Sequence, residues 1–456
     1  MSAVKLVLKV FFLVSFVLMT LLLGGCWDNI ELNSISIVSG IGVDAVPDNP
    51  RKLHVTLQSA NVKAFSTSAG GGGGGDELPF ILNEQQSISI TDAITAIERR
   101  TSRALFTHHN QVVIFGKDYC KNGVQSAIDT FMREDEMRAE TSLVVADGTA
   151  RDMLSIKVEP EKLASQWIPR MQETISFNIG KIDVSVLDFS SSILKPSAAA
   201  VLPIIKVVST PFEENQLEKA VKETENKQQT TESQSEEGQK QEEGGEGQQE
   251  TKKDEAGGGK KEEKKGGGEA ETKDLCLTGL AVFKGPYLVG ELDIEQIRGY
   301  RWLKGDVTAT RLELNVGEGA ANIDISNARF KKKVRLDENN KLIVDFTVEA
   351  DAAIQESFGI DDSEPKQYVE VITKAVNEKI KSEIESCVTK AKELKADIFG
   401  ILNALYEKQP TKYKAIKENK DEVFASFEMN TDIKITVQDT GKLRKSVVEK
   451  WWNDEH

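Results

Sequence analysis

The feature that most constrains this chain is an apolar run near its amino terminus that ends in a cysteine. Two lysines precede the run, and residues 10–23 carry no charged side chain. Two glycines then stand directly before Cys26. A basic start, a short apolar stretch and small residues before a cysteine are typical of a bacterial lipoprotein signal. The sequence therefore predicts that residues 1–25 are a signal peptide and that Cys26 becomes the lipidated first residue.

An ordinary secretory signal or an amino-terminal transmembrane anchor is the alternative explanation of the same run. The run is shorter than the roughly 20 apolar residues that a membrane span requires, and no basic cluster follows it. Two acyl chains on a cysteine hold a protein stably at a membrane. We therefore expect a lipid-anchored, extracytoplasmic protein whose membrane contact is the lipid on Cys26, on the outer face of the cell membrane.

A low-complexity segment divides the rest of the 456 residues. Residues 213–273 consist mainly of Glu, Lys, Gln and Gly, with no aromatic residue, so they cannot bury enough apolar surface to offset the entropy of ordering. The carboxy-terminal region is either one unit or a small domain, 274–306, followed by a larger one, 307–446. The predicted division is an N-terminal α/β domain at 26–212, a disordered linker at 213–273, a C-terminal α+β region at 274–446 and a tail at 447–456.

Hydrophobic periodicity predicts a mixed α/β, or α+β, fold on both sides of the linker. We expect strands at 35–43, 53–59, 111–115, 142–146, 199–208, 277–283, 287–290, 309–316, 323–334, 342–350 and 433–437. We expect helices at 92–105, 122–133, 150–156, 161–172, 294–303, 366–408 and 413–427. Gly400 lies inside the longest helical pattern and marks either a kink or a break between two helices.

Charge and cysteine content exclude some classes of protein. The formal net charge is −15, which disfavours binding to nucleic acid, and we expect no nucleic-acid partner. Apart from Cys26, the cysteines Cys120, Cys276 and Cys387 are far apart and odd in number. They do not form a disulfide framework. One bridge is compatible with an exported protein, but three separate buried or half-buried thiols are the favoured interpretation.

No motif in the chain carries recognisable catalytic, metal-binding or cofactor chemistry. His108 and His109 are the one histidine cluster, and a turn or strand-end role explains them better than a metal site, which needs a third ligand. The stretch from Arg133 to Arg138 has an acidic centre and is typical of a solvated charged face. We therefore expect no catalytic residues, no metal and no cofactor, and hence no enzyme.

Several short stretches together resemble one known family. The resemblance begins at Cys26-Trp27-Asp28 and continues through Gly42-Val43-Asp44, and it is nearly full length apart from the linker. Further matching stretches are Glu31-Leu32, Ser102-Arg103, residues 111–116, residues 133–138, Leu280-Ala281-Val282-Phe283, Leu288-Val289-Gly290, Leu292 and Tyr413-Lys414. On these residues the chain is similar to the Ger(x)C family, the C subunits of nutrient germinant receptors in spore-forming Gram-positive bacteria. The length of the linker and the polyglycine run at 70–75 depart from the family pattern.

The resemblance implies a non-catalytic, lipid-anchored subunit on the outer face of the spore inner membrane. It also implies assembly with an integral-membrane A subunit and a transporter-like B subunit, in response to a nutrient that the sequence does not identify. The alternative is a solute-binding lipoprotein of a membrane transporter, which is expected to have two α/β lobes joined by crossing strands.

A candidate partner-contact surface comprises His108, His109, Arg133 and Arg138. A purely solvated surface explains the same four residues equally well, because exposed charges contribute only about 0–1 kcal/mol. About eight residues separate Cys26 from the first predicted strand, so this tether reaches at most roughly 26–29 Å. We therefore expect the first domain to lie close to the bilayer.

Overall fold

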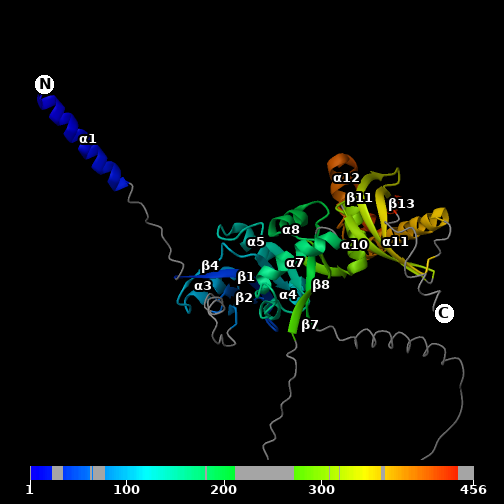
Figure 1. The fold of residues 1–456 in the computed structure, drawn as a ribbon, viewed down its shortest axis with the longest axis horizontal. Helices are drawn as coiled ribbons and strands as arrows, with labels where there is room; N and C mark the ends of the chain where they lie inside the picture. The colour runs from blue at the N-terminus through cyan, green and yellow to red at the C-terminus, as the bar shows by residue number, and fades with distance from the viewer. Residues whose placement is uncertain are drawn as a thin grey trace, which may run out of the picture. The chain divides into compact units, whose positions relative to one another are not determined.

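The structure, a computed structural model, describes residues 2–22, 34–61, 64, 78–179, 182–210, 272–307, 309–317, 319–360 and 365–439 (Figure 1). The chain divides into two compact units, residues 1–206 together with 277–456, and residues 207–276. Cys26, the polyglycine run and nearly all of the low-complexity segment lie outside the described residues. The fold class is α+β with two sheets, as the sequence predicts.

The larger sheet has nine strands. Their order across the sheet is β3 (Phe80–Ser87), β2 (Leu53–Ala60), β1 (Ile35–Ala45), β5 (Val112–Gly116), β6 (Ser142–Ala146), β7 (Ala199–Thr210), β8 (Thr272–Lys284) and β9 (Tyr287–Leu292), and β4 (Ala104–Phe106) also pairs with β1. The run from β1 through β5 and β6 to β7 is parallel, whereas β2 is antiparallel to β1, β3 to β2 and β9 to β8. The amino ends of the four parallel strands therefore lie along one side of the sheet, which we call its amino edge. Their carboxyl ends lie along the opposite side.

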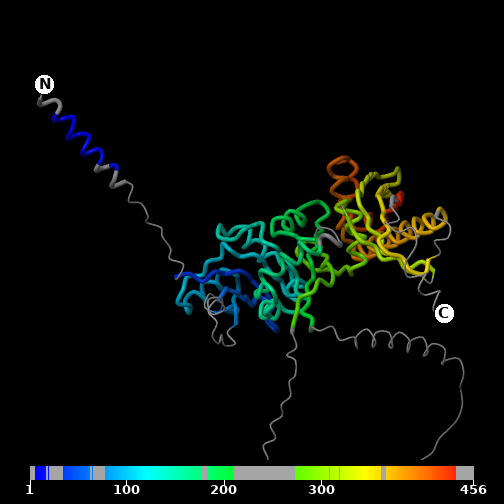
Figure 2. The backbone as a smooth tube through the Cα atoms, viewed as in Figure 1, coloured from blue at the N-terminus to red at the C-terminus, as the bar shows by residue number. Residues whose placement is uncertain are grey.

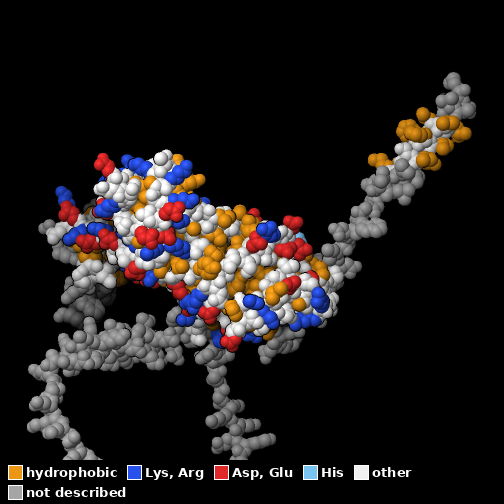
Figure 3. All heavy atoms as spheres, turned by 180° about the vertical axis from the view of Figure 1, so that it is seen from behind, with side chains coloured by type: hydrophobic (Ala, Val, Ile, Leu, Met, Phe, Trp, Pro, Cys, Tyr) orange, Lys and Arg blue, Asp and Glu red, His pale blue; other side chains and the backbone are white. Residues whose placement is uncertain are grey.

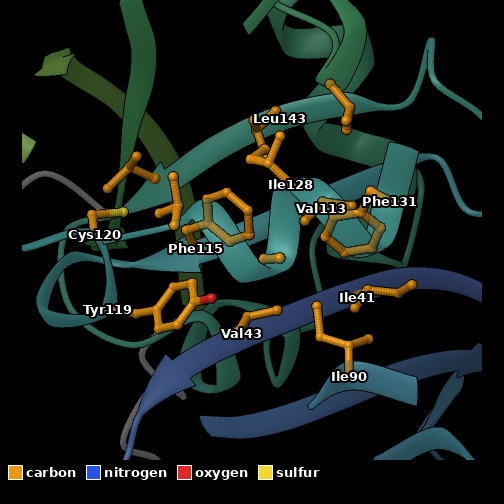
Figure 4. Packing of buried hydrophobic residues seen from close by; sticks show 14 of the residues in the cluster. Ile41, Val43, Ile90, Val113, Phe115, Tyr119, Cys120, Ile128, Phe131 and Leu143 are labelled. Carbon is orange, nitrogen blue, oxygen red and sulfur yellow. The ribbon is translucent and has the colours of Figure 1, made fainter. Parts of the chain in front are cut away.

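Helices cover both faces of this sheet. Alternate residues of a strand point to opposite faces, so Ile41 and Val43 lie on one face of β1 while Gly40 and Gly42 lie on the other. The first face is packed by α3 (Ile90–Glu98), α4 (Lys117–Asn122), α5 (Gln125–Arg133) and α8 (Val186–Leu194). The second face is packed by α6 (Ala150–Leu154) and α7 (Ala164–Ile179). Figure 4 shows Ile41 and Val43 within a buried apolar cluster that includes Phe115.

The stretch Gly42-Val43-Asp44 has a structural role at the end of β1. A Cβ at Gly42 would come within 3.0 Å of the Ala150 side chain, so glycine lets α6 pack closely on the strand. Asp44 accepts hydrogen bonds from the backbone N–H groups of Ala150 (2.7 Å) and Arg151 (3.0 Å), which satisfies two free donors at the start of α6. A side chain at Gly116, the last residue of β5, would collide with the Asp44 carboxylate.

The segment after the linker completes the first sheet. Leu280-Ala281-Val282-Phe283 is buried and lies near the carboxyl end of β8, and Thr278 Oγ1 donates to the carbonyl of Ile204 in β7 at 3.4 Å. Gly285, with φ of 57°, makes the tight turn to β9 that the sequence predicts. The two residues that end the predicted linker, Thr272 and Lys273, belong to β8.

The second sheet has four strands and is covered by a long helix. Its order is β10 (Ala309–Val316), β11 (Gly319–Leu336), β12 (Leu342–Phe358) and β13 (Glu428–Asp439). Buried and exposed residues alternate along β10 to β12, and α11 (Pro365–Glu393) contacts both β10 and β13. The course of the backbone from β9 through α10 (Ile294–Lys304) into this sheet can be followed in Figure 2.

Three predicted helices have different bounds in the structure. Of the two alternatives that the sequence leaves at Gly400 within 366–408, the structure shows the break between two helices: α11 ends at Glu393, and α12 (Ile401–Lys408) begins directly after Gly400, which has a positive φ of 70°, as does Lys395 at 49°. The helix predicted at 92–105 ends at Glu98, since its last residues form β4 and pair with β1. The last predicted helix, 413–427, is a series of short turns: α13 (Pro410–Ile416), a 3-10 turn (Lys417–Asn419) and α14 (Lys420–Ala425).

A buried carboxylate joins α10 to α11. Glu383 of α11 accepts hydrogen bonds from Arg298 Nε at 2.7 Å and from Trp302 Nε1 at 3.2 Å. Gly299 lies against the backbone of Glu383, where any Cβ would collide with its carbonyl oxygen. Burial raises the pKa of the Glu383 carboxyl, and the attraction of Arg298 opposes that shift. The two helices are therefore held by close packing and by one charged side chain that folding removes from water.

Glu383→Gln tests the effect of this burial on the pH dependence of stability. A raised pKa means that the folded state binds the proton more tightly than the unfolded state. Ionisation of Glu383 therefore lowers the free energy of unfolding as the pH rises from about the ordinary value of 4.5 through the raised pKa. We expect the unfolding free energy of Glu383→Gln minus that of the wild type to increase with pH across this window, measured by urea unfolding.

The matched control is Glu385→Gln on the same helix, where the carboxylate is exposed and forms only a weak ion pair with Lys381 at 3.9 Å. The unfolding free energy of Glu385→Gln is expected to stay within about 0.5 kcal/mol of the wild-type value at every pH. If the difference in unfolding free energy between Glu383→Gln and the wild type does not change with pH, burial does not raise the pKa of Glu383.

Candidate partner-contact surface

Three of the candidate residues, His108, His109 and Arg138, lie in two loops at the amino edge of the parallel strands, and Arg133 is the last residue of α5 before the second loop. The loop with His108 and His109 precedes β5, and the loop from Glu134 to Thr141 follows α5 and precedes β6. Val112 pairs with Ser142, so the starts of β5 and β6 are aligned. The two loops are therefore neighbours, although the candidate residues lie 24 to 30 positions apart in the sequence.

Hydrogen bonds join the two loops directly. Thr107 Oγ1 donates to Glu136 Oε2 at 3.1 Å, and Thr141 Oγ1 donates to the carbonyl of Asn110 at 3.3 Å. A third bond connects the second loop to α3, since Thr91 Oγ1 donates to Glu134 Oε1 at 3.2 Å. We call this region, residues 107–111 and 133–141, the amino-edge surface.

The two histidines share one aromatic neighbour. The His108 ring stacks on Phe106 with ring centroids 4.7 Å apart, and the exposed His109 ring meets the same phenylalanine edge-on at 5.4 Å. This geometry is possible because residues 108 and 109 form a turn and not an extended segment. Among the described residues, no three His, Cys, Asp or Glu side chains form a group that could hold a metal ion.

Both arginines of the surface are exposed. Arg133 is 77% exposed and its Nε lies 2.8 Å from Asp129 Oδ1, one turn earlier on α5. Arg138 is exposed in the loop, where its carbonyl accepts a bond from the Thr141 N–H. An exposed pair such as Arg133–Asp129 contributes little to stability, so substitution of these arginines leaves the fold intact.

Two apolar side chains beside the arginines were not predicted from the sequence. Met132 on α5 and Leu187 on α8 are 42% and 43% exposed. Leu187 is placed there by the bond from its N–H to the carbonyl of Ala139 at 2.9 Å. Figure 3 shows acidic and basic side chains interspersed over the face that it presents, with apolar side chains between them. The amino-edge surface itself carries the exposed acids Asp135 and Glu136 beside its two exposed arginines, so it is mixed in charge and not a single-sign patch.

The chain enters the sheet at the same edge. β1 begins at Ile35 and pairs there with β4, and the Gln111 N–H donates to the carbonyl of Ser39 in β1 at 2.9 Å. Cys26 itself lies outside the described residues. None of the described helices, including α1 (Ser2–Leu22), is long and apolar enough to cross a membrane.

In the part of the chain that the structure describes, Cys120, Cys276 and Cys387 form no disulfide. Cys120 and Cys387 are buried, and burial raises the pKa of each thiol. Cys276 is half-buried, and its pKa is also raised, mainly by burial and then by Asp274. Thiols with raised pKa values are poor nucleophiles at neutral pH, so these cysteines fit the structural role that the sequence favours.

Comparison with known proteins gives two family models that match most of the chain. The model described as "Spore germination protein N-terminal domain" matches residues 28–207, and the model described as "Spore germination B3/ GerAC like, C-terminal" matches residues 278–441. The interval between them contains the low-complexity segment. An amino-terminal and a carboxy-terminal germination domain in one chain define the class of spore germination proteins.

Similar individual proteins cover the whole chain. Spore germination protein KC of Bacillus subtilis (strain 168) is 25% identical, and the match covers 96% of this chain and 97% of the relative. Putative spore germination protein YfkR of the same strain is 23% identical, with 94% and 96% covered. The crystal structure of the GerBC protein matches with a TM-score of 0.49 at 15% identity, covering 90% of this chain and 99% of that one.

The chain belongs to the Ger(x)C family, the non-catalytic C subunits of germinant receptors in spores. The resemblance seen in the sequence is thereby confirmed.

Thr107→Val tests the connection between the two loops. The substitution keeps the shape of the buried side chain and removes the hydroxyl that donates to Glu136. We expect a loss of about 1 kcal/mol in unfolding free energy and faster amide hydrogen exchange in residues 134–141. Thr130→Val is the control, because its hydroxyl bonds only to Ser126 within α5, and it should leave exchange in that loop unchanged. Unchanged exchange in Thr107→Val would show that the bond from Thr107 to Glu136 does not hold the second loop in place.

Proposed function

We propose that this chain is the lipid-anchored C subunit of a nutrient germinant receptor, on the outer face of the spore inner membrane. In this proposal a lipid on Cys26 holds the protein at the membrane, and the amino-edge surface contacts the integral-membrane A and B subunits. The similar proteins are named as spore germination proteins, among them Spore germination protein A3 and Spore germination protein B3 of Bacillus subtilis. Those names and the family support membership of a receptor complex.

One geometric observation supports the choice of the amino-edge surface. The strand nearest to Cys26 begins at Ile35, and the amino-edge surface belongs to the same edge of the sheet. The tether between Cys26 and this strand reaches at most roughly 26–29 Å. Loops at this edge are therefore within reach of the extracytoplasmic surface of a membrane partner, and His108, His109, Arg133 and Arg138 are the residues that we propose for the contact.

The low-complexity segment is, in the same proposal, a spacer without a fold of its own. The strands on either side of it, β7 and β8, are neighbours in one sheet. The spacer thus leaves and re-enters the same sheet, and the units that we propose are 26–212 and 274–446, which share this sheet, with a tail at 447–456.

The alternative function, a solute-binding lipoprotein of a transporter, predicts two α/β lobes. The described chain instead has one nine-stranded sheet and one four-stranded sheet of a different topology. This architecture and the family favour the receptor subunit.

Cys26→Ala tests the anchor. The thiol of Cys26 is the group that accepts the diacylglyceryl chain in the proposal, and two acyl chains are what makes attachment stable. We expect the variant to lose incorporation of radiolabelled fatty acid and to leave the membrane fraction or to remain uncleaved. Cys276→Ala is the control and should label like the wild type. Equal labelling of Cys26→Ala would overturn the assignment.

The double charge reversal Arg133→Glu with Arg138→Glu tests the contact surface. Both side chains are exposed, so the melting temperature and the membrane attachment should not change. We expect recovery of the A and B subunits with the affinity-tagged protein from spore membranes to fall at least about tenfold, which corresponds to 1.4 kcal/mol. Quantitative mass spectrometry of the recovered proteins measures this.

The matched control is Arg329→Glu, an exposed arginine on the four-stranded sheet. It should leave recovery of the membrane subunits at the wild-type level. Unaltered recovery in the double variant would move the interface elsewhere, and equal losses in both variants would indicate a general charge effect.

A further inference from the structure

The loop from α3 to β4 is a basic segment outside the amino-edge surface. This loop, residues 99–103, contains the exposed arginines Arg99, Arg100 and Arg103, and Glu98 directly before it is exposed too. We call it the α3–β4 loop. A local excess of positive charge in a chain of net charge −15 favours contact with an anionic partner.

Two of these arginines have no acidic partner in the described part of the chain. Arg99 and Arg103 form no ion pair there, whereas Arg100 Nη2 donates to the carbonyl of Glu84 in β3. The Thr101 hydroxyl lies 3.3 Å from the carbonyl oxygen of Glu98 and 3.0 Å from that of Arg103, so it links the two ends of the loop. A hydrogen-bonded turn therefore carries two exposed guanidinium groups, each of which can donate to two oxygens of one phosphate.

The α3–β4 loop leads into the strand pair at which the chain enters the sheet. Ala104, the first residue of β4, pairs with Ile35, the first residue of β1, and Figure 1 shows β4 beside the start of β1. About eight residues separate Ile35 from Cys26, a reach of at most roughly 26–29 Å. The other end of β1 is about 33 Å away along the strand, because each residue adds about 3.3 Å. With a lipid on Cys26, Arg103 lies at the end of β1 nearest to the bilayer.

An exposed apolar side chain lies at the same edge of the sheet. Leu78, just before β3, is 54% exposed, and its carbonyl accepts a hydrogen bond from Asn61 Nδ2 at 3.0 Å. Ala60 at the end of β2 pairs with Phe80 at the start of β3, which places Leu78 at the amino edge. At a membrane surface, apolar side chains enter the boundary between headgroups and acyl chains while cationic groups stay at the headgroups.

The neighbouring loop of the amino-edge surface has the opposite charge balance. Residues 133–141 contain four acidic residues and two arginines, which suits a protein partner better than anionic headgroups. The three residues of β4, about 10 Å of strand, separate the α3–β4 loop from Thr107, which bonds to Glu136. Exposed charges that far apart are largely screened at physiological salt, so these acids do not cancel the charge of the α3–β4 loop.

We propose that the α3–β4 loop is a second membrane contact, in which Arg99 and Arg103 bind the phosphate groups of phospholipid headgroups. This inference rests on the proposed lipid at Cys26, because that lipid brings the amino edge to the bilayer. A lipid on a flexible tether leaves the domain free to rotate, and a second contact fixes which side of the domain meets the membrane. The contact thereby orients the amino-edge surface towards its partners.

A nitroxide spin label at Ser102→Cys tests the contact in the lipidated protein. Cys120 and Cys387 are buried, and Cys276→Ala removes the remaining accessible thiol. Vesicles contain equal parts of phosphatidylcholine and phosphatidylglycerol with a trace of nickel-chelating lipid, and nickel relaxes a label that meets the headgroups. We expect relaxation at residue 102, weakened by high salt, and none at Lys52→Cys, an exposed position in the turn at the carboxyl end of β1.

Charge reversal identifies the groups that bind. Arg99→Glu with Arg103→Glu should lower the relaxation at residue 102 to the level seen at Lys52→Cys. Arg51→Glu with Lys52→Glu is the matched control, since it reverses two exposed cations at the opposite edge of the same sheet, and it should leave the relaxation unchanged. The melting temperature should not change in either variant, because all four side chains are exposed.

Flotation of the protein with the vesicles separates this inference from the lipid anchor. A protein that does not float would overturn the anchor and the second contact with it. A protein that floats without relaxation at residue 102, or whose relaxation survives the reversal of Arg99 and Arg103, would overturn the second contact alone. Relaxation that requires the A and B subunits in the vesicles would make the loop a protein-contact surface and would also overturn it.

Discussion

The pairing of β8 with β7 is the interaction on which the rest of the fold depends. It places strands from the two sides of a long low-complexity segment next to each other in one sheet. Residues 280–283 of β8 are apolar and buried, so this pairing also contributes apolar surface to the core of the first sheet. An insertion at this point is tolerated because the entropy of closing a loop rises only slowly with its length.

Side-chain contacts extend this connection. Lys284 at the end of β8 pairs with Asp421 at 2.5 Å, and Lys420 donates to the carbonyl of Pro196 at 2.7 Å. On the other hairpin strand, Glu291 pairs with Lys117 at 2.7 Å, and Lys117 also holds Asp147. Sequences far apart in the chain thus meet around β8 and β9. A cavity lined in part by Arg301 lies within the same region, where the two parts of the chain face each other.

Local sequence patterns predicted most of the helices and strands. They could not predict which strands that are distant in the sequence pair with each other. The strict alternation along β10 to β12 and the periodicity of α5 and α10 identify those elements. The strand β3 was missed because its sequence is largely polar, which is typical of an edge strand. The helix α8 was missed because it is rich in serine, although the capping box of Ser185 and Asp188 is a signal that could have found it. Composition predicts a linker at 213–273, but it could not show that the strands on either side, β7 and β8, are neighbours.

The sequence alone could nominate the residues of the candidate surface. It could not show that these residues lie next to one another in the fold. His108 and His109 stand out in the sequence as a histidine pair, and residues 133–138 stand out as a charged stretch. Only the parallel register of β5 and β6 brings their loops together, and the bond between Thr107 and Glu136 fixes them. The burial of Arg301 gave no signal at all, because a basic residue in the last turn of a helix is ordinarily a solvated partner of the helix dipole. That burial follows from the packing of segments that the sequence does not show to be adjacent.

The hydrogen bonds of Arg301 can be compared with those of the buried carboxylates in this protein. Asp44 and Asp397 each accept two backbone N–H groups at the start of a helix, and Glu383 accepts from Arg298 and Trp302. Burial raises the pKa of all three carboxyls, and these donors oppose it. In each case the cost of removing a charge from water is offset by two hydrogen bonds. Arg301 is equally buried, yet one carboxylate, that of Asp306, engages one arm of its fork.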